Sequence, residues 1–440
     1  MKITYKIILF FLISAPIVSA QETKKLSLKE AIVLVTSQSK EVALSKLQTQ
    51  ASLLELQKMR DNQYPNLKIS GEYLRLTNAN ASLKIPMSSS GNSQNGSGVS
   101  VSSLLLGQAN VNMPVFAGFK LQNSISASKA MYEAEKLTAQ QTKEQLALQV
   151  TKLFAQLYQA DQTIMLIAEN IKSAQQREKD FDALMQNGLI TKNDLLKVQL
   201  QVSNLQIALD TAQKNRNVLN YQLSKLLDLP QPTTIEINID AVQKDMQESL
   251  LRANQSNRSD LEALQQQIKA SEYAIKVAKS NYYPALALTG GYIAFDLQNV
   301  LRVSNAMNFG VGISYDVASI FKNKKEVNLS KTKSEQLKVS SEILKNKIDE
   351  EIQAASENYN LSQKQNKVYQ KSVEQSTENY RIINDKYTNG LANTTDLLDA
   401  DVLQLQSKIN LALSQADIAL KYYELQFAQG NLLNSLNISK

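Results

Sequence analysis

Four short segments of the chain alternate apolar and polar side chains with a period of two. They are residues 66–77, 106–116, 285–295 and 307–317. This period is typical of a strand whose two faces meet different surroundings. In the second segment one face is apolar and the other carries amides, on Gln108, Asn110 and Asn112. A strand of about ten residues is long enough to cross a bilayer when tilted, so the pattern predicts four membrane-crossing strands.

The same Tyr-Pro dipeptide precedes the first strand of each pair. Tyr64-Pro65 and Tyr283-Pro284 both stand where a helical pattern stops, and proline cannot continue a helix. The stretch 78–103, which follows the first strand, is rich in Ser, Asn and Gly and predicts a loop. Each pair of strands is therefore expected to form a hairpin.

Long helical intervals separate the hairpins. Residues 119–187 and 321–389 contain neither Gly nor Pro. A helix of that length would run roughly 100 Å. Apolar residues in the first interval recur at alternating steps of four and three, the spacing of a coiled-coil seam. These residues are Leu146, Val150, Leu153, Leu157, Ala160, Ile164, Ile167 and Ile171.

A glycine ends each long interval and a capped helix returns. Thr191 and Asn393 are the expected N-caps, with Asp194 and Asp396 three residues later. The seam resumes after the first turn, with one gap at Arg216. The pattern predicts antiparallel helical hairpins over 119–228 and 321–429.

The whole plan occurs twice. The turn at Gly188 and the turn at Gly390 superpose at an offset of 202 residues. Each half opens with a helix, predicted over 26–62 with a Ser27–Glu30 capping box and over 245–281. We therefore expect an internal duplication, with a first structural repeat over 21–230 and a second over 231–440.

The first twenty residues predict export. Lys2 and Lys6 precede the apolar run 7–13, and Val18-Ser19-Ala20 offers small residues for cleavage. This is the pattern of a signal peptide over 1–20. No later stretch reaches about 18 consecutive apolar residues, so the sequence predicts that any membrane entry uses strands.

Composition removes several classes of chemistry. The 440 residues include no Cys, His or Trp, which excludes disulfides, imidazole bases and the usual zinc ligands. The net charge of +7 comes with no basic block, so we expect no nucleic-acid partner. No carboxylate pair stands in a pocket-forming context and no cofactor loop is present, so we expect neither an enzyme nor a cofactor.

Four strands cannot close a barrel, and open strand edges are not tolerated in lipid. The sequence therefore predicts an oligomer. A cyclic trimer, with twelve strands in all, is the smallest assembly expected to close a barrel without strain. The long helices would continue the tube outside the membrane and enclose a water-filled lumen.

The order of these elements resembles the TolC-like outer membrane efflux proteins over essentially the whole mature chain. The most specific matches are the strand end Pro114-Val115-Phe116-Ala117-Gly118 and the two turns, 187–196 and 387–400. The resemblance implies a mainly α protein with a β-barrel part. Long coiled-coil hairpins would form an α-barrel in the periplasm of a Gram-negative bacterium, and four strands per chain would enter a trimeric twelve-stranded barrel in outer membrane lipid.

The resemblance also implies a function and its partners. Such a homotrimer is the passive exit duct of a tripartite efflux or type I secretion system. It works with a periplasmic adaptor protein and an inner-membrane pump, and it has no catalytic activity. The alternative is a secreted or periplasmic coiled-coil scaffold, but a scaffold has no reason to carry paired strands with one apolar face.

The resemblance places functional residues at the two turns. Asp396 and Asp399 match a pair at the closed periplasmic aperture, where a ring of carboxylates would favour cations. Asp194 and Tyr387 match a network that holds the tips shut, although Ala392 stands where the family has an Arg. The adaptor would contact the tips at Gly188, Leu189, Ile190, Thr191, Gly390 and Leu391.

Plainer explanations exist for these residues. Carboxylates in a first helical turn complement the helix dipole. Both glycines suit an ordinary C-terminal turn. Leu189, Ile190 and Leu391 are expected to be exposed on the tips, and exposed apolar residues there suit an interface. Tyr73, Tyr292 and Tyr315 fit either an interfacial aromatic belt or packing between subunits.

Overall fold

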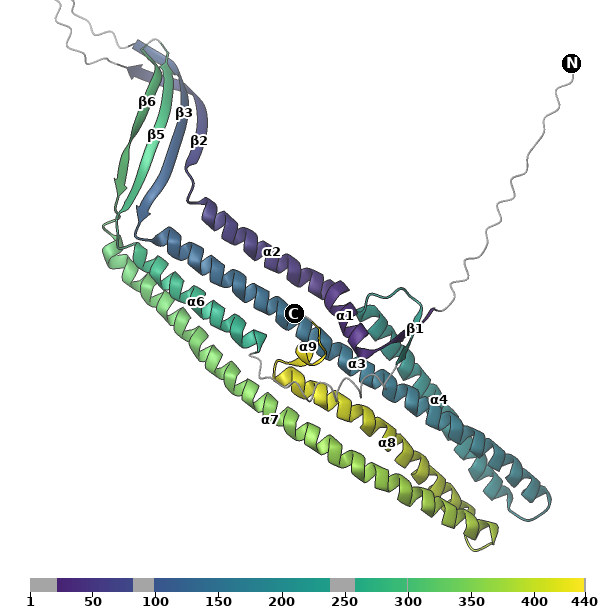
Figure 1. Ribbon diagram of the computed structural model, residues 1–440. Helices are drawn as coiled ribbons and strands as arrows, with labels where there is room; N and C mark the ends of the chain where they lie inside the picture. The colour runs from purple at the N-terminus through teal and green to yellow at the C-terminus, as the bar shows by residue number, and fades with distance from the viewer. Residues whose placement is uncertain (1–21, 82–98, 238–257, 299, 439–440) are drawn as a thin grey trace, which may run out of the picture. The chain divides into compact units, whose positions relative to one another are not determined.

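The computed structural model describes residues 22–81, 99–237, 258–298 and 300–438. The predicted signal peptide, 1–20, lies outside the described residues, and so does the part of the predicted helix 245–281 that precedes residue 258. The chain is mainly helical with some sheet, as predicted (Figure 1).

The helices follow the predicted intervals closely. The helical elements are α1 (Leu28–Gln38), α2 (Lys40–Asp61), α3 (Lys120–Gln186), α4 (Lys192–Leu226), α6 (Ser259–Ser280), α7 (Ser319–Thr388), α8 (Thr394–Ala428) and α9 (Leu432–Ser435). The Ser27–Glu30 capping box is present at the start of α1. The single helix expected over 26–62 is instead broken at Ser39, whose backbone is extended and whose hydroxyl accepts from the Val42 amide at 3.2 Å.

A sheet of four antiparallel strands has the order β2-β3-β5-β6. Its strands are β2 (Asn66–Ala81), β3 (Val99–Ala117), β5 (Ala285–Leu297) and β6 (Leu301–Ser314). The first hairpin extends into the predicted loop 78–103, because residues 79–81 and 99–101 pair across it. Backbone pairing overrides the loop-like composition there.

The last strand ends earlier than the predicted 307–317. Asp316 accepts the Ala318 amide with its carboxylate at 3.0 Å, and its carbonyl accepts the Ser319 amide at 3.0 Å. An aspartate that bonds the backbone two residues on favours a turn over a strand. Asp316 therefore starts the turn into α7.

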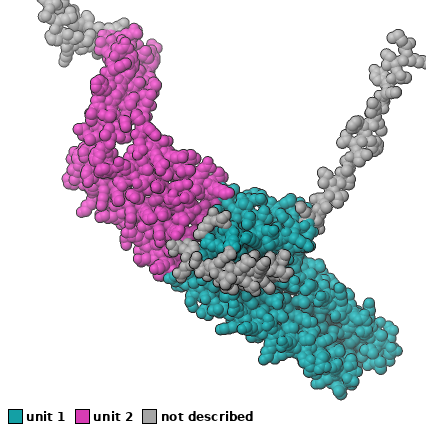
Figure 2. Space-filling model, viewed as in Figure 1, with its two compact units in different colours: residues 1–43, 142–256, 349–440 teal, residues 44–141, 257–348 magenta. Residues whose placement is uncertain are grey.

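The described chain forms two compact units (Figure 2). One unit combines residues 1–43, 142–256 and 349–440, and the other combines 44–141 and 257–348. Each unit thus draws on both predicted repeats, and α2, α3 and α7 each contribute residues to both units.

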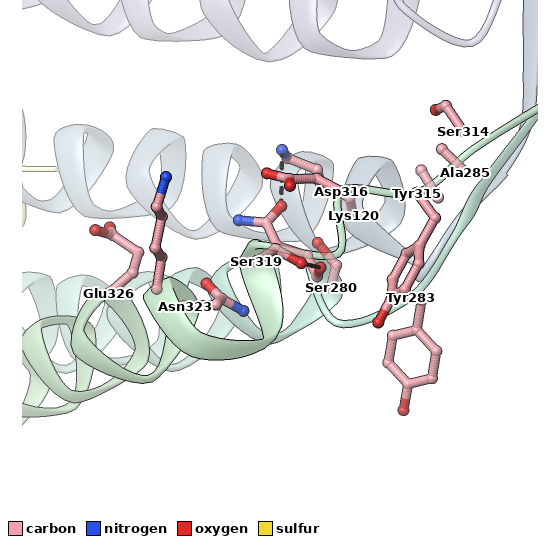
Figure 3. Close-up of a pocket in the computed structure, with 13 residues that line it drawn as sticks. Lys120, Ser280, Tyr283, Ala285, Ser314, Tyr315, Asp316, Ser319, Asn323 and Glu326 are labelled. Carbon is pink, nitrogen blue, oxygen red and sulfur yellow. Dashed lines mark hydrogen bonds between the residues drawn. The ribbon is translucent and has the colours of Figure 1, made fainter.

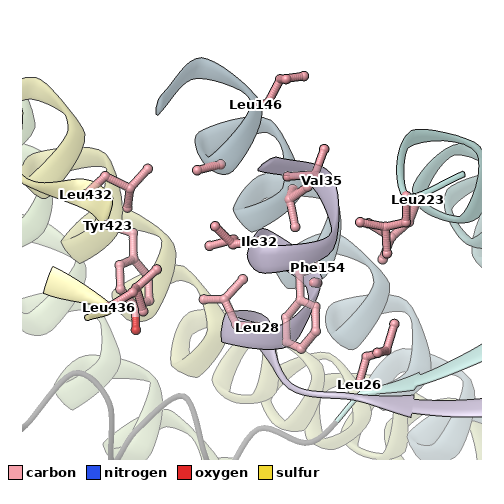
Figure 4. Packing of buried hydrophobic residues seen from close by; sticks show 14 of the residues in the cluster. Leu26, Leu28, Ile32, Val35, Leu146, Phe154, Leu223, Tyr423, Leu432 and Leu436 are labelled. Atoms are coloured by element: carbon pink, nitrogen blue, oxygen red, sulfur yellow. The ribbon is translucent and has the colours of Figure 1, made fainter. Parts of the chain in front are cut away.

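A large apolar core lies in the first unit (Figure 4). Here β1 (Glu22–Leu26) pairs in parallel with β4 (Thr233–Ile237). Side chains from α1, α3, α4, α8 and α9 are almost completely buried, and burying each is worth roughly 1.5–3 kcal/mol. They include Leu28, Ile32, Val35, Leu157, Leu223, Tyr423 and Leu432.

The coiled-coil seam predicted for α3 is largely buried. Leu146, Val150, Leu157, Ile167 and Ile171 are at most 7% exposed. At the gap in the seam of α4, the Arg216 guanidinium binds Asp161 at 2.9 Å and the Ile235 carbonyl at 2.9 Å. A paired charge therefore replaces an apolar seam residue where β4 packs.

In the second unit the sheet joins the helices around a cavity of about 600 Å³ (Figure 3). The Lys120 ammonium donates to the Asn281 side-chain oxygen at 3.2 Å, and the Ser319 hydroxyl donates to the Asn281 carbonyl at 3.0 Å. The Asn323 amide donates to the Ala278 carbonyl at 2.9 Å. These bonds connect the starts of α3 and α7 to the end of α6.

Gly118 makes this junction possible. It stands between β3 and α3 with φ +60°, and a Cβ built on it would lie 2.6 Å from the Ser280 carbonyl oxygen. Residues with a Cβ disfavour this φ. The neighbouring atom belongs to the backbone, so it cannot move aside as a flexible side chain could.

We expect Gly118→Ala to lower the free energy of unfolding by about 1–3 kcal/mol, because the alanine is strained and clashes with the backbone. Thermal unfolding followed by circular dichroism measures the effect. Gly310→Ala is the matched control, since a Cβ there meets no atom within 4 Å. Equal unfolding midpoints for the two variants would contradict the role given to Gly118.

Candidate aperture and adaptor-contact tips

Both helical hairpins turn with the same hydrogen bonds. At the first turn the Gly188 amide donates to Met185 at 2.9 Å and the Leu189 amide donates to Leu184 at 2.9 Å. At the second, the Gly390 and Leu391 amides make the equivalent bonds at 3.0 and 2.8 Å. This pair of bonds is the Schellman motif, which needs a left-handed residue after the helix. Both glycines have φ +71° and supply it.

Each returning helix starts with a capping box. The Asp194 amide donates to the Thr191 hydroxyl at 3.2 Å, and the Asp194 carboxylate accepts the Thr191 amide at 3.3 Å. Asn393 and Asp396 exchange the same bonds at 3.0 and 3.2 Å. Both aspartates therefore satisfy the free amides of a helix start.

The Thr191 hydroxyl also donates to the Asp194 carboxylate at 2.6 Å. This bond, with smaller contributions from the neighbouring Thr394 and Lys197, lowers the pKa of Asp194. Because the folded pKa lies below the usual value, the stabilisation is complete above the ordinary range of an aspartate. It is lost as the pH falls through the folded pKa.

The two turns share one small core. Phe181, Leu195 and Val198 of the first hairpin are buried with Leu397 and Leu398 of the second. The ring of Tyr387 packs against this core and stacks on Phe181, with centroids 5.5 Å apart and planes 6° apart. The Lys197 ammonium adds a hydrogen bond to the Thr395 hydroxyl at 2.9 Å. The tips of the two hairpins are thus held together within one chain.

A buried ion pair further joins the hairpins. The Arg177 guanidinium binds the Asp401 carboxylate at 3.1 Å and the Tyr380 hydroxyl at 3.0 Å. The side chains of Arg177 and Asp401 are 11% and 4% exposed. Burial alone would lower the pKa of Arg177, but the bonds to Asp401 and Tyr380 outweigh it and raise the pKa.

Sequence reasoning missed this pair. Arg177 and Asp401 are 224 residues apart, and each occupies an ordinary position of a long helix. The resemblance implied an arginine near the second turn, but Ala392 occupies that position. The arginine nearest to that turn in α7, Arg381, is exposed and pairs with Glu378 and Asp385 on its own helix.

The predicted site residues differ in what they do in the structure. Structural roles in the caps and turns belong to Asp194, Asp396, Thr191 and both glycines, as described above. Asp399 is exposed and lies one turn after Asp396, on the same helix face. Leu189 and Leu391 are 70% and 78% exposed at the two turns. Ile190 was expected to be exposed with them, but it is half-buried against the tip core.

We expect Arg177→Gln to cost about 3 kcal/mol of stability or more, because it leaves the Asp401 carboxylate buried without its cation. Arg381→Gln is the matched control and should cost under about 1 kcal/mol, since its partners are exposed. Chemical denaturation measures both. Restoration of stability by Arg177→Gln with Asp401→Asn would support the mechanism, and equal losses in the two single variants would contradict it.

Comparison with known proteins identifies the family. The family model described as outer membrane efflux protein matches residues 31–228 and 250–431. A search of curated protein sequences finds no significant match. Among the described residues, no helix combines the length and the apolar character needed to cross a membrane.

Solved structures share the fold at low sequence identity. The outer-membrane channel OprN matches with a TM-score of 0.75 and 14% identity, over 92% of this chain and 90% of that one. The CmeC outer membrane channel of Campylobacter jejuni matches with 0.74 and 16%, over 92% and 86%. The outer membrane protein VceC of Vibrio cholerae matches with 0.74 and 12%, over 92% and 96%.

The family model covers most of both predicted repeats, so it confirms the predicted resemblance, the outer membrane location and the non-catalytic role. The chain belongs to the outer membrane efflux protein family, whose work is export and not catalysis.

Proposed function

We propose that three copies of this chain form the outer membrane exit duct of a tripartite efflux or type I secretion system. The four-stranded sheet would supply one third of a twelve-stranded barrel, and the helices would enclose the periplasmic lumen. The observation that carries the proposal is that this sheet exposes a wide apolar face and has two edges that pair with no other strand of the described chain.

The apolar face continues across all four strands. The register aligns Leu67, Val111, Gly290 and Phe309 in one row, and Ile69, Ala109, Tyr292 and Met307 in the next. Phe309 is 96% exposed, Met307 80% and Ile69 76%. A face this apolar and this exposed has no place in water, but it suits contact with lipid.

The height of the apolar face fits a membrane. On β5 it runs from Leu286 to Ala294, and Asp296 follows on the same face and pairs with Arg302 at 3.8 Å. Eight steps of about 3.4 Å along a strand tilted by about 40° rise about 20 Å, close to the lipid-facing band of about 25 Å in such barrels. The charged pair would then lie at the water boundary.

Of the three tyrosines considered for an interfacial belt, Tyr73 and Tyr315 lie at the two ends of the apolar face. Tyr73 shares a row with Leu105 and Asp296 and is 67% exposed, and Tyr315 follows the last residue of β6. These positions suit an interfacial belt. The Tyr292 hydroxyl instead accepts the Asn305 amide and donates to its side-chain oxygen at 3.0 Å, which ties it to its own hairpin.

The edges of the sheet require partners. β2 pairs with β3 alone and β6 pairs with β5 alone in the described chain. Unpaired backbone groups in lipid cost several kcal/mol each. Pairing β6 of one copy with β2 of the next removes every edge, and three copies give a barrel of ordinary size.

The tips would form the closed aperture and the adaptor contact. Asp396 and Asp399 are both exposed on one helix face, so three copies could bring six carboxylates around one axis. Asp194 and Tyr387 would stabilise the shut arrangement through the cap and the stack on Phe181. Leu189 and Leu391, with the turn residues Gly188, Ile190, Thr191 and Gly390 around them, would meet the adaptor, since exposed leucines favour an interface.

The assembly can be tested directly. The purified protein in detergent should have about three times the mass of one mature chain, because the free edges are satisfied only by other copies. Native mass spectrometry or light scattering measures the mass. A monomer that keeps its full helical content by circular dichroism would contradict the proposed barrel.

The aperture has its own test. Asp399→Asn, and more strongly Asp396→Asn with Asp399→Asn, should weaken block of the channel by multivalent cations about tenfold or more, because carboxylate rings hold such cations. Single-channel recording in planar bilayers measures the block.

Asp180→Asn is the control for the aperture test, since Asp180 is an exposed carboxylate of the other hairpin that accepts a hydrogen bond from Gln176 on its own helix. Because Asp396 also caps α8, the double variant should lose stability while Asp399→Asn should not. Unchanged block in both variants would remove the two residues from the aperture.

A further inference from the structure

The cavity where the sheet joins the helices distinguishes an inner from an outer side of the second unit (Figure 3). Three residues of one register row line it: Ala117, Ala285 and Ser314. The next row, which includes Leu286 and Ile313, belongs to the apolar face. Because side chains alternate across a strand, the cavity opens on the face of the sheet away from lipid.

The helices α3, α6 and α7 each turn one side toward the same interior. A second cavity, of about 710 Å³, is lined by these three helices and shares Lys120, Asn281 and Glu326 with the first. It therefore continues the first cavity on the inner side. Two residues along a helix turn by about 200°. A side chain that stands two positions from a cavity-lining residue consequently lies on the outer side.

Three exposed lysines occupy this outer side. Lys276, Lys279 and Lys324 each have a cavity-lining residue two positions before them and another two positions after them. These flanking pairs are Ala274 and Ala278, Val277 and Asn281, and Lys322 and Glu326. We call Lys276, Lys279 and Lys324 the lysine collar.

The lysine collar lies close to the sheet. Lys279 is the second-last residue of α6, Lys276 is the fifth-last, and Lys324 is the sixth residue of α7. At about 1.5 Å per residue, they stand roughly 2–8 Å from the helix ends that adjoin the sheet. The headgroup layer on each side of a bilayer is about 5–8 Å thick. All three ammonium groups are therefore within reach of headgroups beside the apolar face.

Exposed aromatic side chains connect the collar with the apolar face. Phe321 stands two positions from the cavity-lining Ser319 and Asn323, and it is 82% exposed. Phe119 is 61% exposed, and its ring packs edge-on against Phe116 of the sheet with centroids 5.4 Å apart. Away from the sheet, the outer side thus passes from apolar strands to aromatic rings and then to lysines. This order matches the hydrocarbon core, the interface and the headgroups of a bilayer.

The chain itself does not neutralise the collar. On α6 the first carboxylate beyond it is Glu272, which pairs with Lys338 at 3.6 Å, and on the outer side of α7 it is Glu335. None of the collar ammonium groups forms an ion pair with another residue that the structure describes. Lys324 also lies near the positive end of the α7 dipole, where a cation gains nothing from its own helix. The collar is thus free to bind an external anion.

We propose that the lysine collar binds the phosphate groups of anionic phospholipids in the leaflet that faces the helices. This inference rests on the proposed function, because it takes the apolar face to be embedded in lipid. Lysines beside an anionic membrane surface are attracted to it, and their long stems let the ammonium groups reach the phosphates. With the same collar on each of three copies, the bound headgroups would fix the depth of the barrel in the bilayer.

The lipid preference can be measured on the full chain purified in detergent. Equal amounts of phosphatidylglycerol and phosphatidylcholine with the same acyl chains are added, and native mass spectrometry counts the bound molecules of each. We expect at least about threefold more phosphatidylglycerol to be retained, because only this lipid carries net negative charge. Lys276→Gln with Lys279→Gln and Lys324→Gln should bring the ratio to about one.

A matched variant removes the same charge from other places. In Lys322→Gln with Lys333→Gln and Lys367→Gln, the first two positions line the cavities and the third is an exposed residue of the other unit. This variant should keep the preference, and so should arginine in place of each collar lysine, because the charge remains. Equal retention of the two lipids by the unmodified protein would overturn the inference. An equal loss of preference in the collar variant and the matched variant would overturn it too.

The mass of the protein separates this inference from the proposed function. A trimer that retains both lipids equally keeps the proposed duct and loses the lipid site. A protein that is monomeric in detergent has no closed barrel, so the proposed duct fails. Because the collar lies within one chain, its lipid preference is read from the same spectra in either case. A preference that depends on the collar would still support the placement of the sheet in lipid.

Discussion

Backbone hydrogen bonding at the edges of one sheet is the constraint on which the proposed duct depends. β2 and β6 each leave one row of amides and carbonyls without a strand in the described chain. Water would satisfy these groups, but lipid cannot. The apolar face beside them, with Phe309 almost fully exposed, is adapted to lipid and not to water. These two properties of the same sheet are reconciled when copies of the chain complete one another's barrel.

Backbone hydrogen bonding also determines the structure of the two helical turns at Gly188 and Gly390. Each turn satisfies its last carbonyls with a Schellman glycine and its first amides with a capping box. Asp194 and Asp396 are consequently structural residues whatever else they do, which makes Asp399 the cleaner candidate for a purely electrostatic role at the aperture. The side chains of Leu189 and Leu391, by contrast, are exposed at the two turns.

The tips of the two hairpins are coupled within the protomer. A shared core, the stack of Tyr387 on Phe181 and the buried Arg177–Asp401 pair all join the first hairpin to the second. A buried ion pair is costly to break because each partner would be left uncompensated. Any opening that separates the hairpins must break this pair, whereas an opening that moves both tips together leaves it intact.

The sequence by itself determined the features that depend on near neighbours. Strand alternation, the helical seams, the Ser27–Glu30 box and both capped turns are readable because each involves residues a few positions apart. Tertiary structure alone decided the break at Ser39, the extension of the first hairpin past residue 77, the Arg177–Asp401 pair and the register that aligns the apolar face across the four strands. These features depend on which distant residues meet, and strand register and bulges set those meetings through packing that no local pattern records.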